Sequence, residues 1–118
     1  MTDRELLELA AKAAGWLNTE FQDMRGWGEV RFGLSEALWV PELDCYWNPL
    51  TDDGDALRLA VKIGIHVSAR TVEVWHFGEM IGHIYEDDGD AESATRRAIV
   101  RAAAEIGKAM QQEQGRTP

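Results

Sequence analysis

The segment from Tyr46 to Gly64 constrains the fold more than any other part of the chain. It reads YWNPLTDDGDALRLAVKIG: a loop with aromatic residues and a proline, then an acidic stretch, an apolar run and a glycine. Carboxylates at the start of a helix accept hydrogen bonds from free backbone N–H groups and interact favourably with the helix dipole. Glycine adopts the left-handed backbone that ends many helices. The segment therefore predicts a helix over residues 52–63 that follows an ordered loop.

Apolar residues cover most of the circumference of this predicted helix. They form a stripe at helical spacing that two further residues widen: Ala56, Leu59, Ala60 and Ile63, with Leu57 and Val61 beside them. Only Arg58 and Lys62 keep a polar edge. A helix that is apolar on most sides is expected to be buried on most sides. We therefore expect it to be the most buried helix of the protein.

Two further helices are predicted near the ends of the chain. The first, over residues 3–14, begins with Thr2 and Glu5, which are the hydroxyl and the carboxylate of a capping box. The second, over residues 91–113, follows another acidic stretch and carries an apolar stripe opposite a charged one. The polar residues 114–118 are expected to form a loose tail.

Between the second and third helices the pattern changes to the two-residue period of β-strands. It predicts strands over residues 65–69, 71–77 and 80–86. Gly78 stands at the first central position of a tight hairpin turn, where a type II′ turn needs glycine, so Phe77 is expected opposite Met80. In this register both faces of the hairpin carry bulky apolar residues. We therefore expect a sheet that is covered on both sides.

Residues 15–50 form the least regular part of the sequence, and four of the five tryptophans lie there. We predict an irregular segment with at least one short strand within residues 28–40. Trp and Tyr dominate binding hot spots because they bury a large area at low entropic cost. We therefore interpret Trp27, Trp39, Tyr46 and Trp47 as candidate binding residues on an interaction surface. The alternative, that these rings cover a small core, stays open.

The length of 118 residues fits one domain, and 45% of the residues are hydrophobic, as in a globular chain. The predicted elements indicate the α+β class. We expect a single-domain three-layer α/β/α sandwich with three helices and a small, mainly antiparallel sheet of about three to four strands.

Two segments resemble a known protein family. WNPL together with TDDGDALRLAV, at residues 47–61, resembles the central motif of the phage ABA sandwich domain family. ATRRAIVRAAAEI, at residues 94–106, looks like the closing helix of that family. The resemblance covers residues 43–110 and leaves residues 16–42 unmatched. It implies layers of helix, sheet and helix in a small accessory protein of tailed phages or prophages. Since the family carries no established activity, the resemblance implies no catalytic residues.

The net charge of −9 argues against nucleic acid as a partner, because an acidic protein repels phosphate backbones. No apolar run approaches the ~20 residues that span a bilayer, so no membrane contact is expected. The polar N-terminus lacks the pattern of a signal peptide. The single cysteine, Cys45, has no partner for an internal disulfide, which fits a reducing compartment. We expect the protein in the cytoplasm of a bacterial host.

No nucleotide-binding, metalloprotease or hydrolase motif is present, so we expect neither an enzyme nor a cofactor. We predict a non-enzymatic protein-interaction module whose partner is a host protein, a phage protein or a second copy in a homo-oligomer. The alternative is a small-ligand or metal-binding protein. It would use His76 and His83, which the predicted register sets at diagonal positions on one face, together with Cys45. An acidic decoy for a nucleic-acid-binding host protein is a third reading and rests on charge alone.

Overall fold

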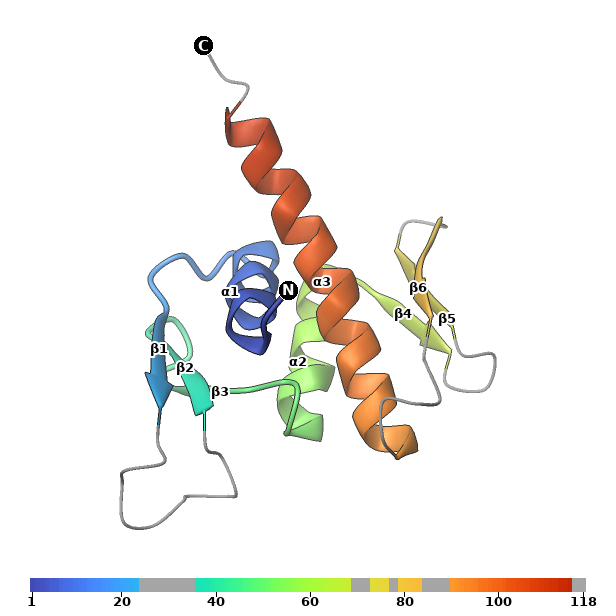
Figure 1. Cartoon of the computed structure of the whole chain (residues 1–118), viewed down its shortest axis with the longest axis horizontal. Helices are drawn as coiled ribbons and strands as arrows, with labels where there is room; N and C mark the ends of the chain where they lie inside the picture. The colour runs from blue at the N-terminus through green and yellow to red at the C-terminus, as the bar shows by residue number, and fades with distance from the viewer. Residues whose placement is uncertain (24–35, 69–72, 77–78, 84–89, 116–118) are drawn as a thin grey trace.

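The computed structural model describes residues 1–23, 36–68, 73–76, 79–83 and 90–115. Its elements in chain order are α1 (Asp3–Ala13), β1 (Glu20–Asp23), β2 (Glu36–Val40), β3 (Cys45–Trp47), α2 (Asp53–Ile63), β4 (His66–Ser68), β5 (Glu73–His76), β6 (Glu79–His83) and α3 (Ala91–Gly115) (Figure 1). The described strands form two antiparallel sheets of three strands each, which we name sheet A (β1-β2-β3) and sheet B (β4-β5-β6).

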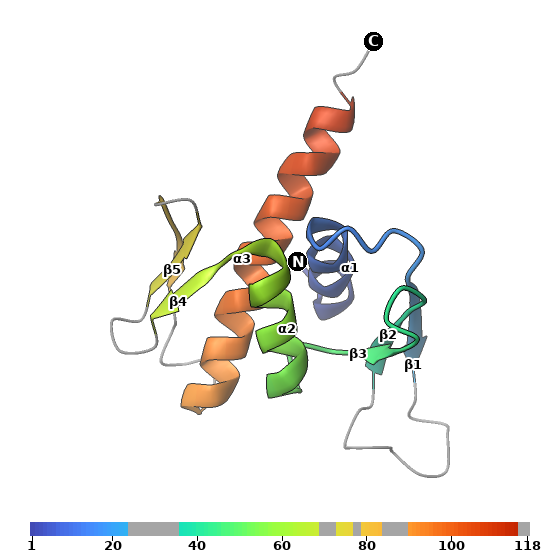
Figure 2. The same ribbon diagram turned by 180° about the vertical axis from the view of Figure 1, so that it is seen from behind.

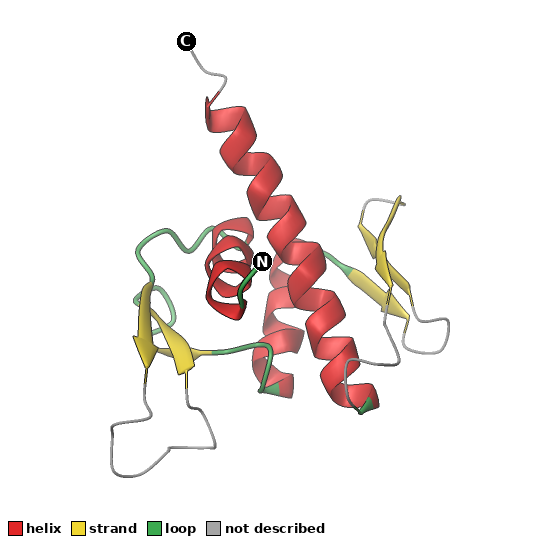
Figure 3. Cartoon of the chain, in the orientation of Figure 1, coloured by secondary structure: helices red, strands yellow, loops and turns green. Residues whose placement is uncertain are grey.

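The predicted α+β class is correct, but the layers differ from those of the expected sandwich. The two sheets lie on opposite sides of the helices, as Figure 2 and Figure 3 show, whereas one sheet between helical layers was expected. The reason lies in the helix contacts, because α1 and α3 bury their apolar faces against each other and leave no room for a sheet between them. No helix in the described part of the chain is long and apolar enough to span a membrane.

The contact between α1 and α3 is built mainly from small side chains. Ala10 and Ala11 of α1 and Ala103 of α3 are fully buried in one core cluster. At Gly107 of α3 a Cβ atom would overlap the backbone carbonyl of Leu9 in α1. Such small residues allow two helix backbones to approach closely. The core of the protein is therefore organised around α3, not around the second helix.

Helix α2 begins and ends as the sequence indicates. Asp52 is the N-cap, and its side chain accepts a hydrogen bond from the Asp55 N–H. Gly64 ends the helix in the left-handed conformation, with φ of 75°. The expectation that α2 is the most buried helix is wrong, since Leu57 and Val61 are 65% and 74% exposed. The core contacts only the side of α2 that carries Ala56, Leu59 and Ala60.

Residues 15–50 are more regular than predicted, because they contain all of sheet A. The expected short strand within residues 28–40 is present as β2. Pairing in register sets Trp39 between Glu20 of β1 and Tyr46 of β3. Asp44 closes the β2–β3 connection with a positive φ of 51°, a conformation that aspartate tolerates. β2 is short, and its buried residues Ala37, Leu38 and Val40 do not alternate strictly with half-buried ones, so the two-residue period of a strand is weak in the sequence.

The hairpin of sheet B has a different register from the predicted one. His76 pairs with Glu79 and Trp75 with Met80, so Met80 does not face Phe77 as expected. An irregularity between Val74 and Trp75 then shifts the ladder. The described strands β4 to β6 lie within or next to the predicted ranges, and the remaining residues of the predicted strands, apart from Ile65, lie outside the described ranges.

Candidate functional site

Trp47, one of the four predicted binding residues, is a core residue in this structure. Its exposed fraction is 0%, and its ring makes an edge-to-face contact with buried Trp16, with centroids 5.2 Å apart. Leu38 and Val40 of the adjacent strand are equally buried. The interpretation of Trp47 as a surface contact is therefore wrong. Alternation along β3 turns its side chain toward the helices.

Trp39 and Tyr46 lie side by side on sheet A, where both rings are half-buried. They are register partners across β2 and β3, and their rings form a T-shaped pair with centroids 5.1 Å apart. Each ring therefore buries part of its surface against the other, which leaves less of it exposed to a partner. Trp27, the remaining predicted binding residue, lies outside the described residues.

The structure does not bring the three residues of the predicted metal site together. Cys45 belongs to sheet A, while His76 and His83 belong to sheet B on the other side of the helices (Figures 1 and 2). The register sets His83 opposite Glu73, three residues along β5 from His76. Among the described residues, no group of three or more His, Cys, Asp or Glu side chains is placed to hold a metal ion.

The half-buried thiol of Cys45 is not activated as a nucleophile. Burial raises the pKa of Cys45, and the nearby carboxylate of Asp55 raises it further. The thiolate is the reactive form of cysteine, so a raised pKa lowers reactivity at neutral pH.

The acidic loop before α2 is a structural junction. The buried side chain of Asn48 donates from Nδ2 to the Glu36 carbonyl at 2.7 Å, and its Oδ1 accepts from the Leu50 N–H at 2.9 Å. Asp55, also buried, accepts from the Asn48 N–H at 2.9 Å and from Arg58 at 3.1 Å. These bonds give the polar groups of both buried side chains hydrogen-bond partners within the protein.

Arg96 of α3 connects the loop before α2 to α3. The Nε atom of Arg96 donates to the Leu50 carbonyl at 3.0 Å, and Nη2 donates to the Ser93 hydroxyl at 2.9 Å. Its Nη1 atom forms an ion pair with Asp53 in the first turn of α2. Because Arg96 is only 16% exposed, these contacts fix the start of α2 beside the start of α3.

Between α2 and α3 lies a groove that the sequence reasoning missed. It has a volume of about 430 Å³, and its walls are mainly apolar: Ala56, Leu57 and Ala60 from α2, Val67 from β4, and Ala91, Thr95 and Ile99 from α3, with Asp53, Glu92 and Arg96 at one end. The exposed side chain of Val61 follows Leu57 one turn later on α2. We name these residues together the α2–α3 groove. The sequence does indicate this groove, because the apolar stripe of α2 is wider than the surface that one neighbouring element can cover.

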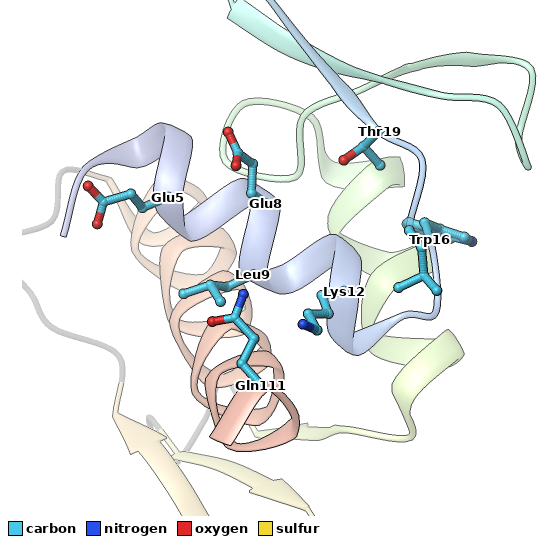
Figure 4. Close-up of a pocket in the computed structure, with 8 residues that line it drawn as sticks. Glu5, Glu8, Leu9, Lys12, Trp16, Thr19 and Gln111 are labelled. Atoms are coloured by element: carbon cyan, nitrogen blue, oxygen red, sulfur yellow. The ribbon is translucent and has the colours of Figure 1, made fainter. Parts of the chain in front are cut away.

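A second hollow lies beside α1 and has a different character. Its volume is about 510 Å³, and Figure 4 shows that charged side chains of α1 surround it, with Gln111 of α3 on one side. Glu5, Glu8 and Lys12 carry charges of both signs, and Glu8 already accepts from Arg4 at 2.7 Å. Leu9, Trp16 and Leu17 also line this hollow, so its lining is mixed, whereas the walls of the α2–α3 groove are mainly apolar.

Comparison with protein-family models, with curated proteins and with solved structures finds no match. The function of the α2–α3 groove therefore has to be argued from its own shape, exposure and charge.

Proposed function

We propose that this protein is a non-enzymatic protein-interaction module that binds a partner protein through the α2–α3 groove. The observation that carries the proposal is the exposure of Leu57 and Val61, at 65% and 74%, one turn apart beside an apolar groove. Contiguous apolar surface of this kind is typical of interaction sites, whereas single exposed apolar residues are common everywhere.

The expected energy of covering this surface sets a condition on the partner. Full burial of a leucine or valine side chain contributes about 1.5–3 kcal/mol. Since Leu57 and Val61 are roughly two-thirds exposed, covering both contributes about 2–4 kcal/mol. A dissociation constant of about 1 μM corresponds to about 8 kcal/mol, after the cost of association has been met. A partner must therefore also fill the groove between the helices, not only touch its rim.

The biological setting is proposed from the sequence. The resemblance of residues 43–110 to the phage ABA sandwich domain family supports an accessory protein of a phage or prophage. The single, unpaired thiol of Cys45 supports the reducing cytoplasm of a bacterial host as the place where it acts.

Site-specific photo-crosslinking in the bacterial host tests this proposal. A benzophenone amino acid replaces Leu57 or Val61 in two variants and Lys62, which is exposed on the polar edge of α2, in the control variant. We expect a discrete protein adduct from positions 57 and 61 and none from position 62. Equal labelling from all three positions, or none from positions 57 and 61, would show that this face binds no partner.

A stability measurement separates loss of the surface from loss of the fold. Leu57→Ser and Val61→Ser remove apolar groups that are already in water, so the free energy of unfolding should change by no more than about 0.5 kcal/mol for each. Leu59→Ser, at a fully buried position on the same helix, should instead unfold much of the protein.

A further inference from the structure

We propose that the occupant of the α2–α3 groove is an amphipathic helix of a partner protein whose basic residues lie at the end of the groove formed by the starts of α2 and α3. This inference rests on the proposed function and adds the chemistry of the partner to it. Three properties of the groove carry it: its direction, its charge and the location of that charge.

The groove runs along two helices that start at the same end. Figures 1 and 2 both show α2 and α3 beginning side by side, and the Asp53–Arg96 ion pair joins the first turn of α2 to the second turn of α3. Residues from successive turns of both helices line the groove, and Val67 closes it toward β4. An elongated apolar groove between two helices matches the apolar stripe of a third helix, which is a common way for proteins to bind helical segments.

The charge of the groove is concentrated at this shared end. Asp52, Asp53, Asp90 and Glu92 are all exposed there, and Arg96 is the basic residue among them. Four negative charges and one positive charge give a formal sum of −3. The two helix N-termini add about half a positive charge each, which leaves about −2. A basic end of a bound helix is therefore attracted, and an acidic end is repelled.

Two of these carboxylates also cap the helices. Asp52 accepts the Asp55 N–H at 2.8 Å and Asp90 accepts the Ser93 N–H at 2.7 Å. The pKa of Asp90 is lowered by the hydrogen bonds from Ser93. Toward the Val67 end, the described residues that line the groove are uncharged. The attraction is therefore directional.

The same charge argues against a second copy of this chain as the occupant. Each copy carries a net charge of −9, and two grooves brought face to face would add one acidic end to another. Charge complementarity therefore favours a different, basic protein.

A displayed library of helical peptides tests the inference. Each peptide has about 15 residues, with leucines fixed at i, i+3, i+4 and i+7 and with Lys, Glu, Gln and Ser equally mixed at the polar positions. The library is selected on the whole wild-type protein and depleted on the Leu57→Ser/Val61→Ser double variant. Lys should exceed Glu by about tenfold at polar positions of one end, a preference of the size expected for directed charge pairing.

A charge-removal variant shows where the preference originates. In Asp52→Asn/Asp90→Asn/Glu92→Gln the helix caps are retained, because Asn caps as well as Asp, and three negative charges are removed. The dissociation constant of a selected basic peptide should rise about tenfold in low salt, and the difference should shrink in high salt.

The outcomes separate this inference from the function on which it rests. If no peptide depends on Leu57 and Val61, the groove is not an interaction site and both proposals fail. If the selected peptides depend on Leu57 and Val61 but show no excess of Lys, the proposal of a basic helix is wrong, while the proposal of an interaction module stands. A dimer in sedimentation experiments that Leu57→Ser dissociates would identify a second copy as the occupant and also overturn it.

Discussion

The backbone N–H of Asn48 donates a hydrogen bond of 2.9 Å to the Oδ2 atom of Asp55, and both residues are buried. Through its own side chain Asn48 also holds the Glu36 carbonyl at the start of β2. One hydrogen-bond network thus connects sheet A, the loop and helix α2. This network gives the buried polar residues of the acidic loop a structural role.

Replacing Asp55 with alanine should lower the free energy of unfolding by about 1–3 kcal/mol, because the buried Asn48 N–H would lose its acceptor. Asp55→Asn keeps an oxygen acceptor at nearly the same place and should be much less destabilising. Chemical denaturation at neutral pH measures both. Equal losses for the two variants would mean that the carboxylate charge, not the acceptor, is what the site needs.

The stability contributed by Asp55 should fall as the pH rises. Burial raises the pKa of Asp55 in the folded state, while the hydrogen bond from Asn48 opposes this shift. Between the ordinary aspartate pKa of about 4 and the raised value, the folded state binds more protons than the unfolded state. The contribution is therefore complete below about pH 4 and is lost as the pH passes through the raised pKa.

Denaturation of wild type and Asp55→Asn across this pH range isolates the effect. The stability of wild type relative to Asp55→Asn should decrease with rising pH. A difference that stays constant, or that increases with pH, would contradict a raised pKa.

Gly107→Ala should destabilise the protein by about 2–3 kcal/mol, although alanine normally stabilises a helix by about 1 kcal/mol relative to glycine. The added Cβ would overlap the Leu9 carbonyl, and a backbone atom cannot move aside by changing rotamer. Thermal denaturation measures the change. Lys108→Ala, at the next and exposed position, is the control and should stay within about 0.5 kcal/mol of wild type.

Trp47→Ala should lower the free energy of unfolding by about 3–5 kcal/mol, as expected for the loss of a large buried ring. Trp39→Ala removes a half-buried ring from the sheet surface and should have a clearly smaller effect. Urea denaturation followed by circular dichroism compares them. If Trp39 proved the more costly to remove, sheet A would have to face the core through its other side.

The helix over residues 52–63 could be predicted because its signals are local. The cap at Asp52 and the stop at Gly64 act on backbone groups within one turn, so the same residues specify them in any surroundings. Strand β2 was only partly recognisable, since it has five residues and its buried positions do not alternate regularly.

The candidate site was not predictable in the same way. Trp47 and Leu57 both look apolar in the sequence, yet one is fully buried and the other is 65% exposed. Trp47 was predicted to be a binding residue because it is aromatic. The exposed apolar surface lies instead on α2, a helix that was expected to be buried. The predicted set of His76, His83 and Cys45 failed because sequence does not show that the two sheets are on opposite sides of the helices.

The sequence by itself therefore determined the helices, their caps, the α+β class and the acidic charge, all of which depend on residues close together in the chain or on composition. Only the tertiary structure decided which apolar residues form the core and which form the α2–α3 groove. The physical reason is that burial depends on contacts between distant segments. The close approach of α1 and α3 at Gly107 and Leu9 contributes to the core along α3, while the core covers only one side of α2.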